Sequence, residues 1–136
     1  MSAENDINIP IDAKKFLQLL INHLPMKVFW KDKDSIYEGS NRAFAEFAGL
    51  NEEESIIGKN DYDLPWAETK ADEFRLYDRS IMDMNEKEMN YISKITNAEG
   101  IEFWTKTTKI PIENENGEVV GVLGFLQEKN IIPPVK

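Results

Sequence analysis

The sequence predicts an α+β fold in which strands near both ends of the chain enclose a helical middle. Two β-rich segments, 26–31 and 35–38, come early, and three longer ones follow at 88–96, 101–112 and 118–127. The residues between the two groups show helical spacing and turn signals instead. Strands grouped in this way favour antiparallel pairing, whereas a parallel sheet requires strands and helices to alternate.

The first predicted element is an amphipathic helix over residues 12–24. Asp12 is a typical N-cap residue, and Pro25 stops the helix because proline lacks an amide donor. Between them the apolar residues recur at helical spacing and form one stripe: Phe16, Leu17, Leu20, Ile21 and Leu24. The polar residues 1–11 that precede this helix are expected to be a leader.

Shorter elements are predicted between the second strand and the long helix. Asn41 is expected to cap a short helix that ends at Gly49, where glycine supplies a left-handed exit. A tight segment follows at 60–66, after Gly58. The longest helix is predicted over 67–85, where apolar residues step by three or four: Ala67, Ala71, Phe74, Tyr77, Ile81 and Met84.

The last three predicted strands are separated by turns at 97–100 and 113–117, both rich in Asn and Gly. The proline-containing segment 131–136 follows them. We expect it to be a linker to a downstream module, because its two prolines cannot continue a helix.

Bulk composition excludes several classes of function. The 136 residues suffice for one domain with one core. Lys and Arg total 16 against 25 Asp and Glu, and a net charge of −9 repels phosphate backbones and anionic lipids. Cysteine is absent, and no apolar run approaches the roughly 20 residues that span a bilayer. We expect a cytoplasmic protein with no nucleic-acid partner and no direct membrane contact.

Few residues offer catalytic or metal-ligating chemistry. His23, the single histidine, lies at the end of the first helix, where the helix dipole favours it, and it has no partner ligands in sequence. Of Asp61 and Asp63, one is expected to cap the short helix near Leu64. No Asp-x-Asp-x-Asn-Gly loop is present, so no metal site is predicted. An enzymatic role for Asp61 as a base ranks last, because the sequence offers no oxyanion partner.

Short motifs occur along the chain in a specific order. They are Leu24-Pro25, Phe29-Trp30-Lys31-Asp32, Asn41-x-x-Phe44 with Gly49, Gly58-Lys59-x-Asp61-x-Asp63-Leu64-Pro65-Trp66, Gly100 before Phe103-Trp104, Thr108-Lys109-Ile110-Pro111 and Gly117-x-x-x-Gly121. In this order they resemble the PAS family, in the style of sensory-box histidine kinases, over residues 12–130. The resemblance implies a five-stranded antiparallel sheet with short helices and one long helix on one face, enclosing a ligand-sized pocket.

The resemblance also implies that no cofactor is bound. Flavin photoreceptor members carry a reactive cysteine where this chain has Asp61. The polar residues that hold the flavin correspond to Ile95, Thr105 and Leu126, of which two cannot form side-chain hydrogen bonds. Haem-binding members use a histidine on the long helix, and residues 67–85 contain none.

Strand alternation assigns side chains to the two faces of the sheet. The resemblance implies a ligand pocket between the inner face and the helices over it, and alternation along the strands turns Ile95, Thr105, Thr107 and Leu126 toward that pocket. The expected pocket residues are Phe44, Asp61, Leu64, Trp66, Phe74, Tyr91, Ile95, Thr105, Thr107 and Leu126. For Trp66, packing in the core is an equally good interpretation.

The outer face is expected to expose an apolar patch that a monomer does not leave bare. The stripe of the first helix would cover it, from the same chain or from a second copy. The predicted dimer interface comprises Phe16, Leu17, Leu20, Leu24, Trp30, Trp104, Leu123 and Phe125.

Together these observations predict a PAS sensor and dimerisation domain that is not an enzyme. We expect a homodimer that senses a small apolar ligand and acts on a downstream kinase or other output domain, with a two-component histidine kinase as the expected parent. The alternative is a ligand-free scaffold used only for dimerisation. Inward packing of Phe44, Phe74 and Tyr91 would favour that alternative.

Overall fold

The computed structural model describes residues 10–86 and 88–128, and it contains one antiparallel sheet with the strand order β2-β1-β5-β4-β3. The strands are β1 (Lys27–Asp32), β2 (Tyr37–Ser40), β3 (Glu88–Thr96), β4 (Glu102–Glu113) and β5 (Val119–Glu128). The helices are α1 (Ala13–Ile21), α2 (Arg42–Phe47) and α3 (Ala71–Met84), with short 3₁₀ turns η2 (Glu53–Ile56) and η3 (Asp61–Asp63). The predicted α+β class and five-stranded sheet are confirmed.

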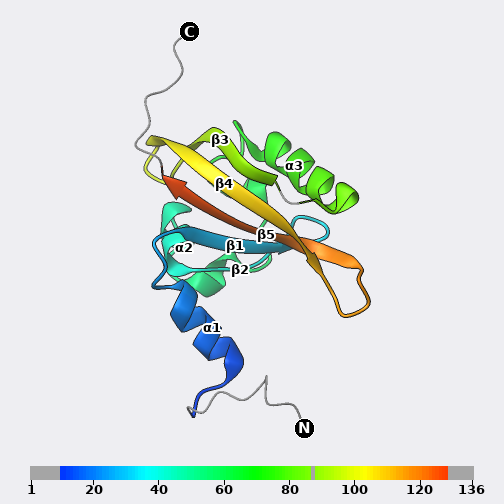
Figure 1. Cartoon of the computed structure of the whole chain (residues 1–136). Helices are drawn as coiled ribbons and strands as arrows, with labels where there is room; N and C mark the ends of the chain where they lie inside the picture. Colours follow the sequence, from blue (N-terminus) through cyan, green and yellow to red (C-terminus); the bar gives the residue numbers. More distant parts are fainter. Residues whose placement is uncertain (1–9, 87, 129–136) are drawn as a thin grey trace.

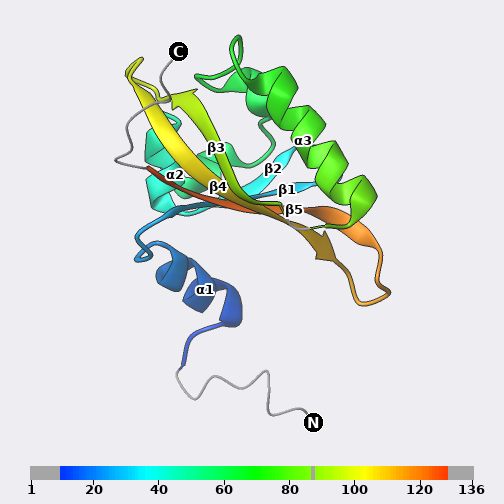
Figure 2. The same ribbon diagram turned by 45° about the horizontal axis from the view of Figure 1, so that its top comes forward.

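The two faces of the sheet are covered differently. In Figure 1 the sheet is seen obliquely, with α3 above the strands and α1 below them. Figure 2 shows α3 and α1 on opposite sides of the sheet. We call the face under α2 and α3 the inner face and the face toward α1 the outer face. Of the predicted leader and linker, residues 1–9 and 131–136 lie outside the described residues.

The first helix begins as predicted and ends earlier. Asp12 caps it by accepting a hydrogen bond from the Lys15 amide at 2.8 Å. The helix ends at Ile21 instead of residue 24, because the Asn41 side-chain amide donates to the Ile21 carbonyl at 2.7 Å and to the Met26 carbonyl at 2.9 Å. The buried Asn41 thereby ties the end of α1 to the start of β1.

Two other predicted boundaries were wrong. Strand β2 starts at Tyr37 instead of residue 35, because the Asp32 carboxylate accepts the amides of Asp34 and Ile36 and prolongs the turn. Ser35 in this turn has a φ of 63°. Helix α3 begins at Ala71 instead of residue 67, since residues 67–70 form turns that fold back on the 64–66 segment.

The strand register places side chains on the faces that alternation predicts. Phe29 pairs with Gly124 on the inner face, and Trp30 pairs with Leu123 on the outer face. A Cβ atom at Gly124 would lie 2.2 Å from the Phe29 ring, so only glycine leaves room for this ring. The aromatic core that results packs between the inner face and the helices: Phe29, Tyr37, Phe44, Phe47, Trp66 and Phe74.

Candidate functional site

A small cavity lies inside the aromatic core, against the inner face of the sheet. Its volume is about 20 Å³, which is space for about one water molecule. Its walls are Phe29, Lys31, Tyr37, Phe44, Trp66, Phe74, Tyr91, Ser93, Ile95, Thr105, Thr107, Lys109 and Leu126. All five strands therefore contribute to the wall of the cavity, and residues from α2, α3 and the 61–66 segment help to close it.

Most of the predicted pocket residues meet at this cavity. Those that line it are Phe44, Trp66, Phe74, Tyr91, Ile95, Thr105, Thr107 and Leu126. Two predicted residues do not line it: Leu64 packs in the core, and Asp61 is held by neighbouring polar groups. Two lysines, Lys31 and Lys109, also form part of the wall and were not among the predicted pocket residues.

Four buried ionisable side chains, Lys31, Asp61, Asp78 and Lys109, form a connected network that we call the charge cluster. The Lys31 ammonium lies 2.8 Å from the Asp61 carboxylate and 2.7 Å from the Asp78 carboxylate. The Lys109 ammonium lies 2.7 Å from the other oxygen of Asp78. All four side chains are at most 4% exposed, so these contacts are shielded from water.

Neutral donors complete the coordination of both carboxylates. Asp61 accepts hydrogen bonds from the Tyr37 hydroxyl at 2.7 Å and from the Trp66 indole at 2.8 Å. Asp78 accepts one from the Ser35 hydroxyl at 3.2 Å. Each carboxylate therefore accepts three hydrogen bonds, which offsets the cost of burying its charge.

The charges of the cluster set the protonation of its members. Burial raises the pKa of Asp78, but Lys109 and Lys31 outweigh burial and hold this pKa below its ordinary value. Burial lowers the pKa of Lys31, while Asp78 and Asp61 more than compensate and raise it overall. Burial also lowers the pKa of Lys109, which is paired with a single carboxylate. Asp78 is thus held ionised at neutral pH by its two lysines.

The sequence pattern already contained the signal for three cluster residues that were not predicted. Lys31 lies two residues after the inward Phe29, and Lys109 lies two residues after the inward Thr107, so alternation turns both lysines inward. Asp78 follows Phe74 by one helical turn and therefore faces the core with it.

Two polar groups of the cavity wall retain hydrogen-bonding capacity. The Ser93 hydroxyl is buried and makes no hydrogen bond of normal geometry to a described residue, although the nearby Tyr91 hydroxyl interacts with it. The Lys109 ammonium, which has three donors, makes one hydrogen bond to a described side chain, that of Asp78. By contrast, the Thr105 hydroxyl donates to the Ser93 carbonyl at 3.2 Å. The cavity thus combines aromatic walls with unused polar atoms.

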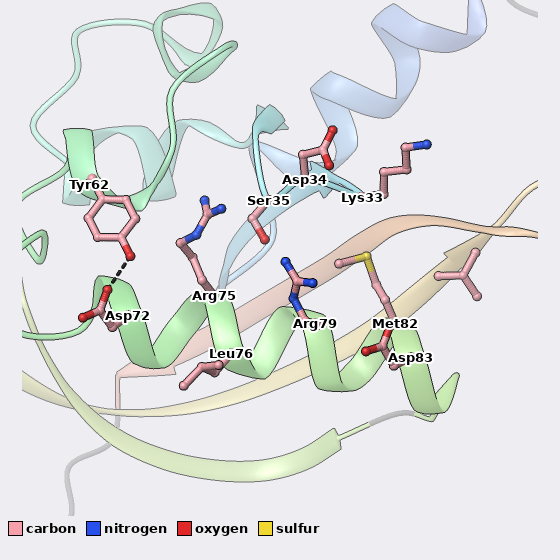
Figure 3. A pocket seen from close by; sticks show the side chains of 11 residues that line it. Lys33, Asp34, Ser35, Tyr62, Asp72, Arg75, Leu76, Arg79, Met82 and Asp83 are labelled. Carbon is pink, nitrogen blue, oxygen red and sulfur yellow. Dashed lines mark hydrogen bonds between the residues drawn. The ribbon is translucent and has the colours of Figure 1, made fainter.

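A second hollow, of about 620 Å³ and open to the surface, lies between α3 and the turn that joins β1 to β2. In Figure 3 the side chains of Arg75 and Arg79 extend from α3 toward Asp34 and Ser35 of that turn. Ser35 lines the hollow and also donates to Asp78, so this surface touches the charge cluster. Its lining mixes cationic and acidic side chains, which does not select a ligand of one charge.

An apolar groove of about 530 Å³ separates α1 from the outer face of the sheet. Its walls include five of the predicted interface residues: Leu17, Leu24, Trp30, Leu123 and Phe125. Phe16 and Leu20 lie exposed on α1, at 37% and 52%. Trp104 does not line the groove, and its ring lies 5.5 Å from the Lys94 ammonium. Helix α1 therefore covers the outer face only in part.

The other predicted polar residues have structural contacts. The N-cap of η3 is Asn60 instead of Asp61 or Asp63, and the Asp63 carboxylate completes the capping box by accepting the Asn60 amide at 3.0 Å. His23 Nδ1 lies 2.8 Å from the Leu19 carbonyl oxygen. Among residues 10–86 and 88–128, no group of three or more metal-ligating side chains occurs. No helix in the described part of the chain is long and apolar enough to cross a membrane.

Comparison with solved structures supports the fold. VqmA bound to DPO is 25% identical with a TM-score of 0.77, over 87% of this chain and 58% of that one. The Vibrio cholerae VqmA dimer is 24% identical with a TM-score of 0.78, over 88% and 53%. A sensory box sensor histidine kinase from Vibrio cholerae is 16% identical with a TM-score of 0.61, over 88% and 94%.

This chain spans between half and three fifths of the length of these two VqmA structures. A comparison with the curated proteins finds no match. The family model described as "PAS fold" matches residues 15–129, which is nearly the whole sequence. The sheet order, the helices over its inner face and the enclosed cavity agree with that match, and the chain belongs to the PAS family.

Proposed function

We propose that this PAS domain is a ligand sensor and dimerisation module of a signal-transduction protein. The observation that carries the proposal is the polar part of the cavity wall, where Lys109 and Ser93 retain unused hydrogen-bonding capacity. A buried polar group without a partner costs about 1–3 kcal/mol. A ligand that supplies the missing partners would recover part of this free energy.

The relatives support both parts of this proposal. VqmA was solved bound to DPO and as a dimer, and it is 24–25% identical to this chain. A sensory box histidine kinase shares the fold, which supports a kinase as the output domain of the parent protein. VqmA is described among LuxR-type receptors with a target DNA, which supports a transcription regulator instead. In either case the acidic PAS domain itself would contact neither DNA nor substrate.

A ligand-free scaffold is the second candidate function, and the cavity volume favours it. A cavity of about 20 Å³ is far smaller than the roughly 150 Å³ that holds a benzene ring. Phe44 and Phe74 pack inward and are 1% and 9% exposed. A ligand with a ring therefore requires part of the wall to move, and α3 carries the Phe74 part of that wall.

Native mass spectrometry of protein purified from a bacterial host separates the two functions. The sensor function predicts a non-covalent adduct that is released on denaturation. The adduct should disappear in Thr107→Leu, which fills the cavity, and persist in the outer-face control Trp104→Ala. Circular dichroism checks that both variants fold. If wild-type protein from several growth media carries no adduct, the scaffold function is the better account.

The apolar groove supports pairing with a second copy through the outer face. Leu17 on α1 is half exposed, and Leu123 and Phe125 line the facing wall. We expect a dimer by light scattering that is weakened at least tenfold by Phe125→Glu. The control Leu76→Glu, at a side chain that is 69% exposed on α3, should leave it intact. Deleting residues 1–24 should produce a monomer or aggregation, and a wild-type monomer would contradict the proposal.

A further inference from the structure

The charge cluster beside the cavity is balanced. Lys31 and Lys109 contribute two positive charges, and Asp61 and Asp78 contribute two negative charges, within side chains that are nearly inaccessible to water. An additional ion in this environment would lose its hydration without finding an unpaired opposite charge within the cluster. The balance therefore disfavours both anionic and cationic ligands.

The hydrogen bonds of the two buried lysines show which polar group a ligand would supply. Among the side chains that the structure describes, Lys31 is bonded to two carboxylates and Lys109 to one, Asp78, although an ammonium group has three donors. The Lys109 ammonium also lies 5.4 Å from the centre of the Phe74 ring, within the aromatic part of the wall. A ligand acceptor at this position would accept a hydrogen bond from Lys109 and would leave the contact between Lys109 and Asp78 intact.

The remaining wall is suited to a flat, largely apolar molecule. Six aromatic side chains line the cavity: Phe29, Tyr37, Phe44, Trp66, Phe74 and Tyr91. Aromatic rings pack favourably against other rings in stacked or edge-to-face geometry. The Ser93 hydroxyl, on β3 opposite Thr105 of β4, also lines the cavity and offers a second polar contact.

We propose that the cavity selects a compact, uncharged ring compound with a hydrogen-bond acceptor, such as a carbonyl oxygen or ring nitrogen, which Lys109 binds. This inference rests on the proposed sensor function and specifies its ligand class. Lys109 stays paired with Asp78, so the ligand is linked to α3 through two consecutive polar contacts. Because the cavity must enlarge to admit a ring, binding displaces the wall that carries Phe74 and Asp78.

Four probes of similar shape and different charge test the ligand class. Benzamide is neutral with an acceptor, benzoate is anionic, benzamidine is cationic, and toluene has no acceptor. Binding is measured by ¹H–¹⁵N NMR titration and by the shift in melting temperature. The titrations are repeated in Leu126→Ala, which enlarges the cavity and removes size as a reason for failure to bind. We expect benzamide to bind at least tenfold more tightly than the other three.

A charge-balanced double variant, Lys109→Met with Asp78→Asn, tests the role of Lys109. It removes one charge of each sign and retains the pair between Lys31 and Asp61. We expect it to bind toluene as the wild type does and to lose the preference for benzamide. Should this variant fail to fold, Lys109→Gln, which retains an amide donor, should weaken benzamide binding and leave toluene binding unchanged.

The outcomes separate this inference from the sensor function. If benzoate binds as tightly as benzamide, the inference on ligand charge is overturned while the sensor function stands. If toluene and benzamide bind equally tightly to the wild type, Lys109 does not contribute to ligand recognition. If no probe binds even in Leu126→Ala, both the ligand class and the sensing cavity are refuted, and the ligand-free scaffold remains.

Discussion

Replacing Asp78 with asparagine tests the charge cluster on which the site depends. Asn is nearly isosteric with Asp, so the change removes a charge without creating a cavity. In the folded protein Asp78 accepts hydrogen bonds from Lys31, Lys109 and Ser35. The variant leaves Lys109 without a carboxylate and gives the buried cluster a net positive charge.

The expected loss in the free energy of unfolding follows from this geometry. Breaking a fully buried ion pair by removing one partner typically costs about 3–5 kcal/mol, because the other charge remains buried and uncompensated. Asp78 has two such contacts, each of 2.7 Å. We therefore expect the loss in the free energy of unfolding of Asp78→Asn to lie within or above that range. Such a loss is a large part of the roughly 5–15 kcal/mol that stabilises a native protein.

Urea unfolding followed by tryptophan fluorescence measures this loss, since Trp66 is buried and its indole donates to Asp61. The matched control is Asp83→Asn, an exposed position on the same helix, which should change stability by less than about 0.5 kcal/mol. Adding Lys109→Met to Asp78→Asn restores charge balance and should recover part of the loss. A loss below about 1 kcal/mol for Asp78→Asn would refute the buried network.

Three further predictions concern the same interior. Ser93→Ala should raise the free energy of unfolding by about 1 kcal/mol, measured in urea, because it removes a buried hydroxyl that makes no hydrogen bond of normal geometry to a described residue. The pKa of Asp78 is depressed by its lysines, so its stabilising effect is present above the unfolded carboxyl pKa of about 3.9 and is lost as the pH falls through the lower folded value. Unfolding in urea between pH 7 and pH 3 should show this dependence, reduced in Asp78→Asn. Gly121→Ala should destabilise by about 1–3 kcal/mol, since the new Cβ would lie 2.2 Å from the Lys31 carbonyl oxygen.

Each of these predictions has an outcome that contradicts it. A destabilised Ser93→Ala would mean that the hydroxyl has a partner in solution. Identical pH dependence in wild type and Asp78→Asn would show that the carboxyl is not held in its ionised form by the lysines. For Gly121→Ala the control is Val120→Ala, 39% exposed on the same strand, and equal effects would rule out a steric clash.

The sequence by itself determined the elements and the faces of the sheet. Asn41 and Gly49 marked the ends of α2, and strand alternation placed Phe29, Thr107 and Leu126 inside and Trp30 outside. These features depend on local periodicity and on backbone preferences, which each segment has independently of its neighbours.

Boundaries that depend on distant partners could not be predicted from local pattern. The end of α1 at Ile21 depends on Asn41, twenty residues later, and the start of β2 depends on the Asp32 side chain within the preceding turn. The incomplete cover of the outer face likewise depends on the position of α1 relative to the sheet.

For the charge cluster too, the sequence indicates the orientation of the side chains but not the contacts between them. Periodicity turns Lys31, Lys109 and Asp78 toward the interior, yet it does not say that they meet. Their contacts require β1, β4 and α3 to pack together, and the volume of the cavity depends on how the surrounding rings fill the remaining space. Only the tertiary structure decided these distances, because packing between elements is settled by the whole set of side chains at once.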